Sequence, residues 1–96
     1  MRGQPSMVDE LKPVPPSKRW GQMPRHYHPD DAPWISAKLG TLDPSLRAEV
    51  CAAYAKAYLD AWEAEHLIHR KHGNARFAAN TRLRVFIGKR FAVFNR

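Results

Sequence analysis

The chain has 96 residues and a formal net charge of +7, from 16 Lys and Arg residues against nine Asp and Glu residues. A chain of this length forms one small domain that buries only about 60% of the surface its unfolded form exposes, which excludes an enzyme with a separate cofactor domain. Its apolar runs are shorter than the ~20 residues of a membrane-spanning helix, and the first 24 residues lack the apolar segment of a secretory signal. The single cysteine, Cys51, excludes an internal disulfide framework and is typical of a protein in a reducing cytosol.

The N-terminal region is rich in proline, with seven of the eight prolines in the first 33 residues. Because proline lacks a backbone N–H and restricts the residue before it, residues 1–24 are predicted to form a flexible, disordered, basic arm. Trp20 lies in this arm beside Lys18 and Arg19, so it is a candidate anchor that stacks on a base or fills a partner's pocket. The alternative is that Trp20 packs back on the helical domain, which is predicted to span residues 25–96.

A short helix is expected over about residues 32–39. Asp31 suits the N-cap position, and Pro33 suits the first turn, where a missing N–H does no harm. Gly40 follows the last apolar residue and provides a stop signal.

The longest predicted helix covers residues 44–72. Asp43 and Pro44 give a doubled start signal, and Gly73 gives the stop. A helix of this length, roughly 42 Å, needs a partner along much of its length. Large apolar residues recur in it at intervals of three and four, which is the helical period; they are Leu46, Val50, Tyr54, Tyr58 and Trp62.

The C-terminal segment is predicted to fold back as a second long helix over residues 75–87 or beyond, after a turn at Gly73 and Asn74. Gly88 lowers helix stability by about 1 kcal/mol relative to alanine, so the helix could end there. The Val- and Phe-rich residues 84–94 also fit a short strand. The predicted fold class is therefore mainly all-α, a helical hairpin with a short additional N-terminal helix.

Positive charge is concentrated at the C-terminal end. Residues 73–96 hold six bases and no acid, and such a block attracts polyanions or an acidic protein surface; the alternative is a solvated helix face. Arginine favours bidentate contact with phosphate or carboxylate, and Arg and Asn are side chains that read base edges in a major groove. The candidate binding residues are Arg76, Asn80, Arg82, Arg84, Lys89 and Arg90.

The same segment carries more large apolar residues than one partner helix covers. An exposed apolar patch of this kind often marks an interface, so we expect a homodimer or docking on a larger host complex. The candidate anchors, besides Trp20, are Phe86, Ile87, Phe91 and Phe94.

No catalytic group or cofactor site is expected. His66, His69 and His72 are spaced three apart, so two of them could reach one metal ion but hardly all three. Asp60 and Glu63 lie near His66, yet acid–base work needs a pocket that so short a chain is barely large enough to form. We therefore assign no catalytic residue, no metal and no cofactor.

Three segments, PRHYH (24–28), PWISAKL (33–39) and ANTRLR (79–84), look like those of small accessory proteins of temperate phages and prophages. The resemblance covers about residues 24–87 and transfers no functional residue. It implies a setting in the bacterial cytoplasm, in phage genome maintenance or in interference with host machinery.

The sequence thus predicts a non-enzymatic, basic binding protein that contacts nucleic acid or a nucleoprotein through its C-terminal Arg-rich segment, with no membrane involved. The alternative is a protein–protein inhibitor or adaptor that docks on a host complex, for example an anti-defence or host-takeover protein. In that case the same arginines would meet carboxylates.

Overall fold

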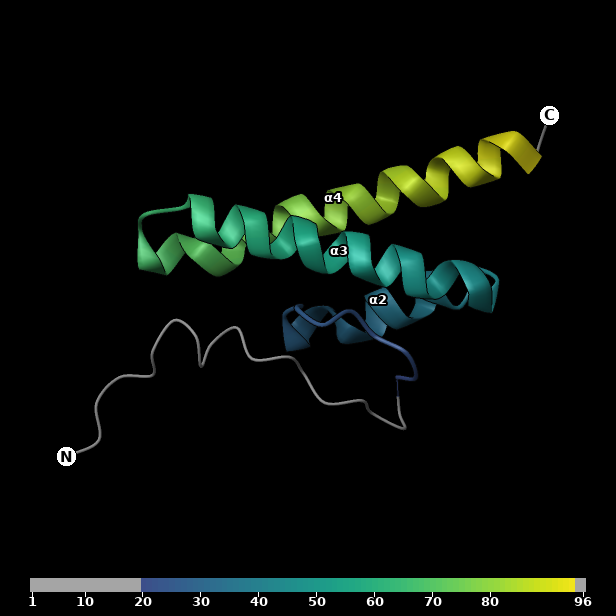
Figure 1. Cartoon of the computed structure of the whole chain (residues 1–96), viewed down its shortest axis with the longest axis horizontal. Coiled ribbons are helices and arrows are strands. Elements are labelled where there is room, and N and C mark those ends of the chain that lie inside the picture. The colour runs from purple at the N-terminus through teal and green to yellow at the C-terminus, as the bar shows by residue number, and fades with distance from the viewer. Residues whose placement is uncertain (1–19, 95–96) are drawn as a thin grey trace.

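The computed structural model describes residues 20–94 of the chain and the side chains of residues 20–90. A short 3-10 turn, η1 (Pro29–Asp31), leads into α2 (Ala32–Leu39), which is followed by α3 (Pro44–Ala64) and α4 (Ile68–Phe94). The predicted all-α fold is confirmed: α3 and α4 form a helical hairpin, and the short α2 lies along one side of α3 (Figure 1). No helix in this described part is long and apolar enough to cross a bilayer.

The start and end of α2 match the prediction, and local capping explains both. The His28 ring nitrogen Nδ1 accepts a hydrogen bond from the Asp30 N–H at 3.1 Å, which begins η1. At the other end, Arg47 Nε donates to the carbonyl oxygens of Leu39 at 2.9 Å and Leu42 at 3.0 Å. The Leu39 carbonyl also accepts the Leu42 N–H at 3.1 Å, so Arg47 adds a second bond at the end of α2 and fixes the connection from α2 to α3.

The turn between the two long helices is not where the sequence predicted it. The chain leaves the helix at residues 65–67, while Gly73 and Asn74 lie inside α4. The reason is Lys71, whose ammonium donates to the carbonyl oxygens of Trp62, at 2.9 Å, and of Glu65. It satisfies carbonyls at the C-terminal end of α3, and this tertiary cap outweighs the stop signal of a glycine.

Glu65 completes the turn. Its carboxylate accepts the Leu67 N–H at 3.0 Å and also a hydrogen bond from the Asn74 side chain. Together these bonds begin α4 at Ile68, well before the helix expected over residues 75–87.

The C-terminal end of α4 is helical. The helix passes through Gly88 and ends at Phe94, so neither the break at Gly88 nor the alternative strand over residues 84–94 forms. Leu83 and Ile87 are buried just before Gly88, and this burial holds the helix where its glycine weakens it.

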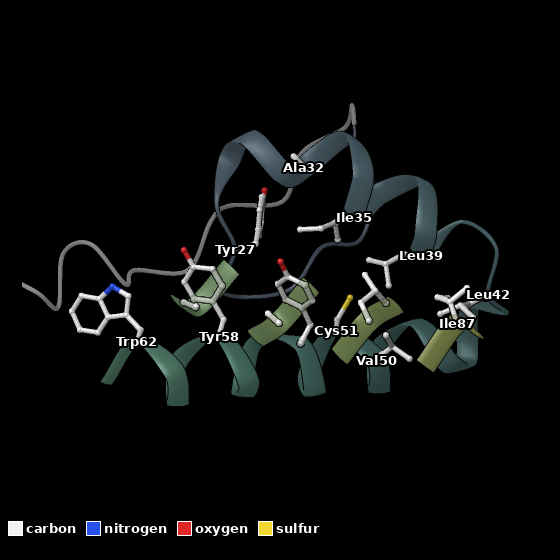
Figure 2. Close-up of a cluster of buried hydrophobic side chains, with 14 residues drawn as sticks. Tyr27, Ala32, Ile35, Leu39, Leu42, Val50, Cys51, Tyr58, Trp62 and Ile87 are labelled. Carbon is white, nitrogen blue, oxygen red and sulfur yellow. The ribbon is translucent and has the colours of Figure 1, made fainter. Parts of the chain in front are cut away.

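The core lies where α2, α3 and α4 meet. In Figure 2, Tyr58 points from α3 toward the segment of Tyr27, and Ile35 points from α2 toward α3. Ala75 and Ala79 are completely buried, so α4 packs closely against its neighbours through small side chains. The buried positions of α4 recur every four residues, at Lys71, Ala75, Ala79, Leu83 and Ile87.

The predicted boundary of the arm at residue 24 is wrong for its last part. The Ser36 hydroxyl donates to the Trp20 carbonyl oxygen at 2.9 Å, and Pro24 is fully buried. The Trp20 side chain is partly buried against the core, together with Met23. Residues 20–24 therefore belong to the domain, whereas the predicted disorder of residues 1–19 lies outside the described residues.

Lys71→Met keeps the apolar stem of the side chain but removes the ammonium that caps α3. We expect the free energy of unfolding to fall by about 1–3 kcal/mol, because buried carbonyls lose their donor. Urea unfolding followed by circular dichroism measures this change. Lys56→Met is the matched control, since Lys56 is exposed and only pairs with Asp60 on the same helix; equal effects of the two substitutions would contradict the capping role.

Candidate functional site

Helix α4 is the cationic element of the molecule. It carries seven Lys and Arg residues and no Asp or Glu over its 27 residues. Its C-terminal end diverges from α3 and points away from the hairpin (Figure 1). The bases therefore lie in two settings, one packed against the domain and one projecting from it.

Two of the predicted binding residues, Arg76 and Asn80, turn inward. The Arg76 guanidinium donates from Nε and Nη2 to the two carboxylate oxygens of Asp31, at 2.9 and 2.8 Å. The Asn80 side chain donates to the same carboxylate at 3.1 Å and accepts the Tyr54 hydroxyl. The side chains of Arg76 and Asn80 hold α4 against the rest of the domain, so neither is placed to bind a partner as the sequence predicted.

The charges around Asp31 agree with this structural role. Hydrogen bonds from Arg76 lower the pKa of the Asp31 carboxyl below its ordinary value, despite the opposing effect of burial. Burial raises the pKa of Tyr54, so its hydroxyl stays protonated and donates to Asn80. The negative charge of Asp31 is therefore compensated by Arg76, and the neighbouring Asn80 and Tyr54 are neutral.

The other predicted bases remain toward solvent. Arg82 and Lys89 are exposed, and within the described part of the chain neither has an ion-pair or hydrogen-bond partner. Arg84 is exposed as well, with its guanidinium 5.0 Å from the centre of the Trp34 ring of α2, a cation–π distance. Arg90 is half-buried.

The exposed bases flank an uncharged face. An α-helix advances about 100° per residue, so Arg82 and Lys89 lie about 20° apart on one side, and Arg84 lies on the other. Between them is a strip that we call the outer face of α4. Phe77 and Val85 are 73% and 49% exposed on it. The outer face consists of Phe77, Thr81, Val85 and Gly88.

Of the predicted apolar anchors, some are buried in the core and others are exposed. Ile87 is 6% exposed and belongs to the core, so it is not an exposed anchor. Phe86 is 36% exposed at the edge of the hairpin, and Trp20 packs on the core. The side chains of Phe91 and Phe94 lie outside the described residues.

The prediction missed Phe77 and Val85 as exposed apolar residues. The signal was present in the sequence: both lie off the series of positions 75, 79, 83 and 87, which supplies the buried stripe of α4. A four-residue series with alanine at its first two positions marks the packed side, and residues opposite it face solvent.

A groove runs between α3 and α4 beside these bases. It encloses about 230 Å³ and is lined by Glu49 and Ala53 of α3 and by Arg82, Leu83 and Phe86 of α4. Arg82 and Phe86 also line an adjoining hollow together with Lys89. The groove therefore has apolar walls with one acid and one base, and its cations lie mainly toward the adjoining hollow.

The histidines do not gather into a metal site. Among the described residues, no group of three or more His, Cys, Asp or Glu side chains is placed to hold a metal ion. His72 Nδ1 instead shares a 2.8 Å hydrogen bond with the Tyr58 hydroxyl, whose pKa burial raises to about 12. His72 also meets the rings of His28 and Trp62 edge-on. It is thus part of the hairpin packing.

Cys51 is buried among apolar neighbours. Burial raises the pKa of its thiol, which keeps it protonated and weakly nucleophilic.

Asp31→Asn tests the network that turns Arg76 inward. At neutral pH we expect a loss of about 1–2 kcal/mol in unfolding free energy, since the charge-assisted bonds weaken and Arg76 is partly exposed. The folded-state pKa of Asp31 is lowered, so its contribution is complete above the unfolded value of about 3.9 and is lost as pH falls through the folded value. The stability gap between wild type and variant should therefore close on acidification.

Urea unfolding over a pH series measures that gap. Asp60→Asn is the control, because Asp60 forms an exposed i,i+4 pair with Lys56 that is worth only about 0.3–0.5 kcal/mol. A gap for Asp31→Asn that stays constant down to about pH 2 would count against the ion pair as its source.

Comparison of this chain with protein-family models, with curated proteins and with solved structures found no match.

Proposed function

We propose that this protein binds nucleic acid through the C-terminal half of α4 and catalyses no reaction. The observation that carries the proposal is the pair of exposed bases Arg82 and Lys89, which lack partners in the described part of the chain and lie on a helix without acids. Cations aligned about 20° apart and roughly 10 Å along one helix present charge at a spacing that phosphates can meet.

The bonds that each base already makes determine how much free energy it loses when it binds a phosphate. Arg76 would have to give up two hydrogen bonds to Asp31 before it met a phosphate. Arg82 and Lys89 give up only water, and Arg84 can keep its position over Trp34. The favourable free energy comes from counterions released by the nucleic acid, so affinity should fall steeply with salt.

The bacterial cytoplasm and a phage or prophage setting, which the resemblance implies, form part of this proposal. A basic protein of this size binding nucleic acid there would serve genome maintenance or act on a host nucleoprotein.

A second candidate is an inhibitor or adaptor that docks on an acidic protein surface. The hollow beside the groove supports it, because Phe86 and Val85 lie there with Arg82 and Lys89 and no acid lines it. A partner with carboxylates beside apolar side chains would match this composition, whereas the groove itself also holds Glu49. Such a partner would stay bound after nuclease treatment, whereas a partner held through nucleic acid would be released.

The double substitution Arg82→Gln and Lys89→Gln tests the leading proposal. We expect affinity for a labelled duplex at about 50 mM salt to fall by at least about tenfold. The slope of log affinity against log salt should become shallower by about 1.8, or about 0.9 for each phosphate that is no longer neutralised. Fluorescence anisotropy across a salt series gives both quantities.

The matched control is Lys56→Gln with Arg70→Gln. It removes the same net charge from two exposed positions, one on α3 and one in the first turn of α4. It should change affinity far less than the test pair. Equal losses in the two double variants, or a wild type whose affinity does not respond to salt, would contradict the proposal.

A further inference from the structure

We propose that the outer face of α4 enters the major groove of duplex DNA, with the backbone at Gly88 closest to the base pairs. This inference rests on the proposed function and specifies its ligand. The observations behind it are the arrangement of charge around α4, the shape of its exposed end and the lack of any need for glycine at position 88.

The charge pattern matches a groove with two walls. The outer face carries no charge, while Arg82 and Lys89 lie on one side of it and Arg84 on the other, about 60° to 100° around the helix from its centre. In a major groove, the phosphates of the two strands border a floor of base edges. A helix seated with its outer face on that floor directs these bases toward both strands.

The dimensions and the charge pattern favour duplex DNA over other nucleic-acid forms. A helix with side chains is about 10–12 Å wide, which fits the ~12 Å major groove of B-form DNA. The major groove of double-stranded RNA is too deep and narrow for it. A single strand offers one line of phosphates, which would leave either Arg84 or the pair Arg82 and Lys89 without a phosphate to bind.

Nothing within the described part of the domain blocks this approach. The buried stripe of α4 faces α2 and α3, and Phe77 and Gly88 lie on the exposed side of the helix. Thr81 and Val85 lie next to them, at the edge of the open hollow that Ala57 of α3 also lines. The C-terminal half of α4 also diverges from α3 (Figure 1), which gives a duplex room beside it.

The free protein explains neither of the two glycines of α4, and Gly88 is the one that lies on the outer face among the exposed bases. The φ of Gly88 is not positive, and a Cβ built on it meets no atom of the described residues within 4 Å. Neither backbone conformation nor packing requires glycine, and glycine weakens a helix by about 1 kcal/mol relative to alanine. A missing side chain on the outer face does allow another surface to come close to the helix backbone.

The rest of the outer face suits the floor of the groove. Thr81 and Val85 present methyl groups, and Phe77 presents a ring. Apolar side chains of this kind contact the C5-methyl group of thymine. They offer few hydrogen-bond donors, so recognition would depend on phosphates and close fit more than on base identity.

The test is a graded series at Gly88, with Ala and Leu, measured against the same series at Gly73. Gly73 also lies in α4 with no atom within 4 Å of a Cβ, but about 22 Å from Gly88 along the helix. All four variants should unfold at a temperature equal to or above that of the wild type, because Ala and Leu favour helix more than Gly does.

Anisotropy with a DNA duplex, the matching single strand and a double-stranded RNA of the same sequence gives the affinities. We expect the wild type to prefer the DNA duplex, Gly88→Ala to bind it about fivefold more weakly and Gly88→Leu more weakly still. The Gly73 variants should bind as the wild type does.

The failures of the two proposals differ. If the wild type binds with the expected salt slope but the Gly88 variants match it, or if single strand or RNA binds as well as the DNA duplex, the major-groove inference is overturned and nucleic-acid binding stands. If the wild type binds none of the three probes at low salt, both are overturned.

Discussion

The carboxylate of Asp31 determines which side chains of α4 are available to a partner. It accepts two hydrogen bonds from Arg76 and one from Asn80, and so ties the start of α2 to the middle of α4. Position 76 and the buried alanines face the domain, and further along the helix Leu83 and Ile87 point into the core while Arg82 and Lys89 are exposed.

Acidic residues act on the N-terminal half of α4. Glu65 meets the first turns through Leu67 and Asn74, and Asp31 meets Arg76. Lys71 belongs to the same half, where its ammonium lies at the C-terminal end of α3, the negative end of that helix dipole. A charge that would be unfavourable near the start of its own helix is thereby stabilised by its neighbour. In this half of α4, Lys71 and Arg76 serve the fold, and their charges are engaged within the domain, whereas Arg70 is exposed.

The sequence was sufficient where signals are local. The bounds of α2 and the start of α3 were predicted correctly from residues next to them, Pro33, Gly40 and Pro44. Asp31 precedes α2 as expected, but its side chain makes no capping bond and binds Arg76 and Asn80 instead. The hairpin turn was misplaced because Lys71 caps a helix nine residues before it, and no spacing rule records such an interaction. Arg76 and Asn80 were indistinguishable from Arg82 by composition, since their partner lies 45 and 49 residues away.

The uncompensated charge of α4 also distinguishes between the expected partners. Exposed ion pairs contribute only about 0–1 kcal/mol, so leaving Arg82 and Lys89 without acids costs the fold little. The same charges oppose a homodimer that joins two outer faces, because like cations would be brought together where Phe77 and Val85 meet their copies. A polyanion removes that repulsion and makes use of Arg82, Arg84 and Lys89 together. The exposed apolar residues Phe77 and Val85 therefore do not by themselves indicate self-association. Because α4 has no acids, these residues are better covered by a partner that carries negative charge on both sides of the contact, as a duplex does.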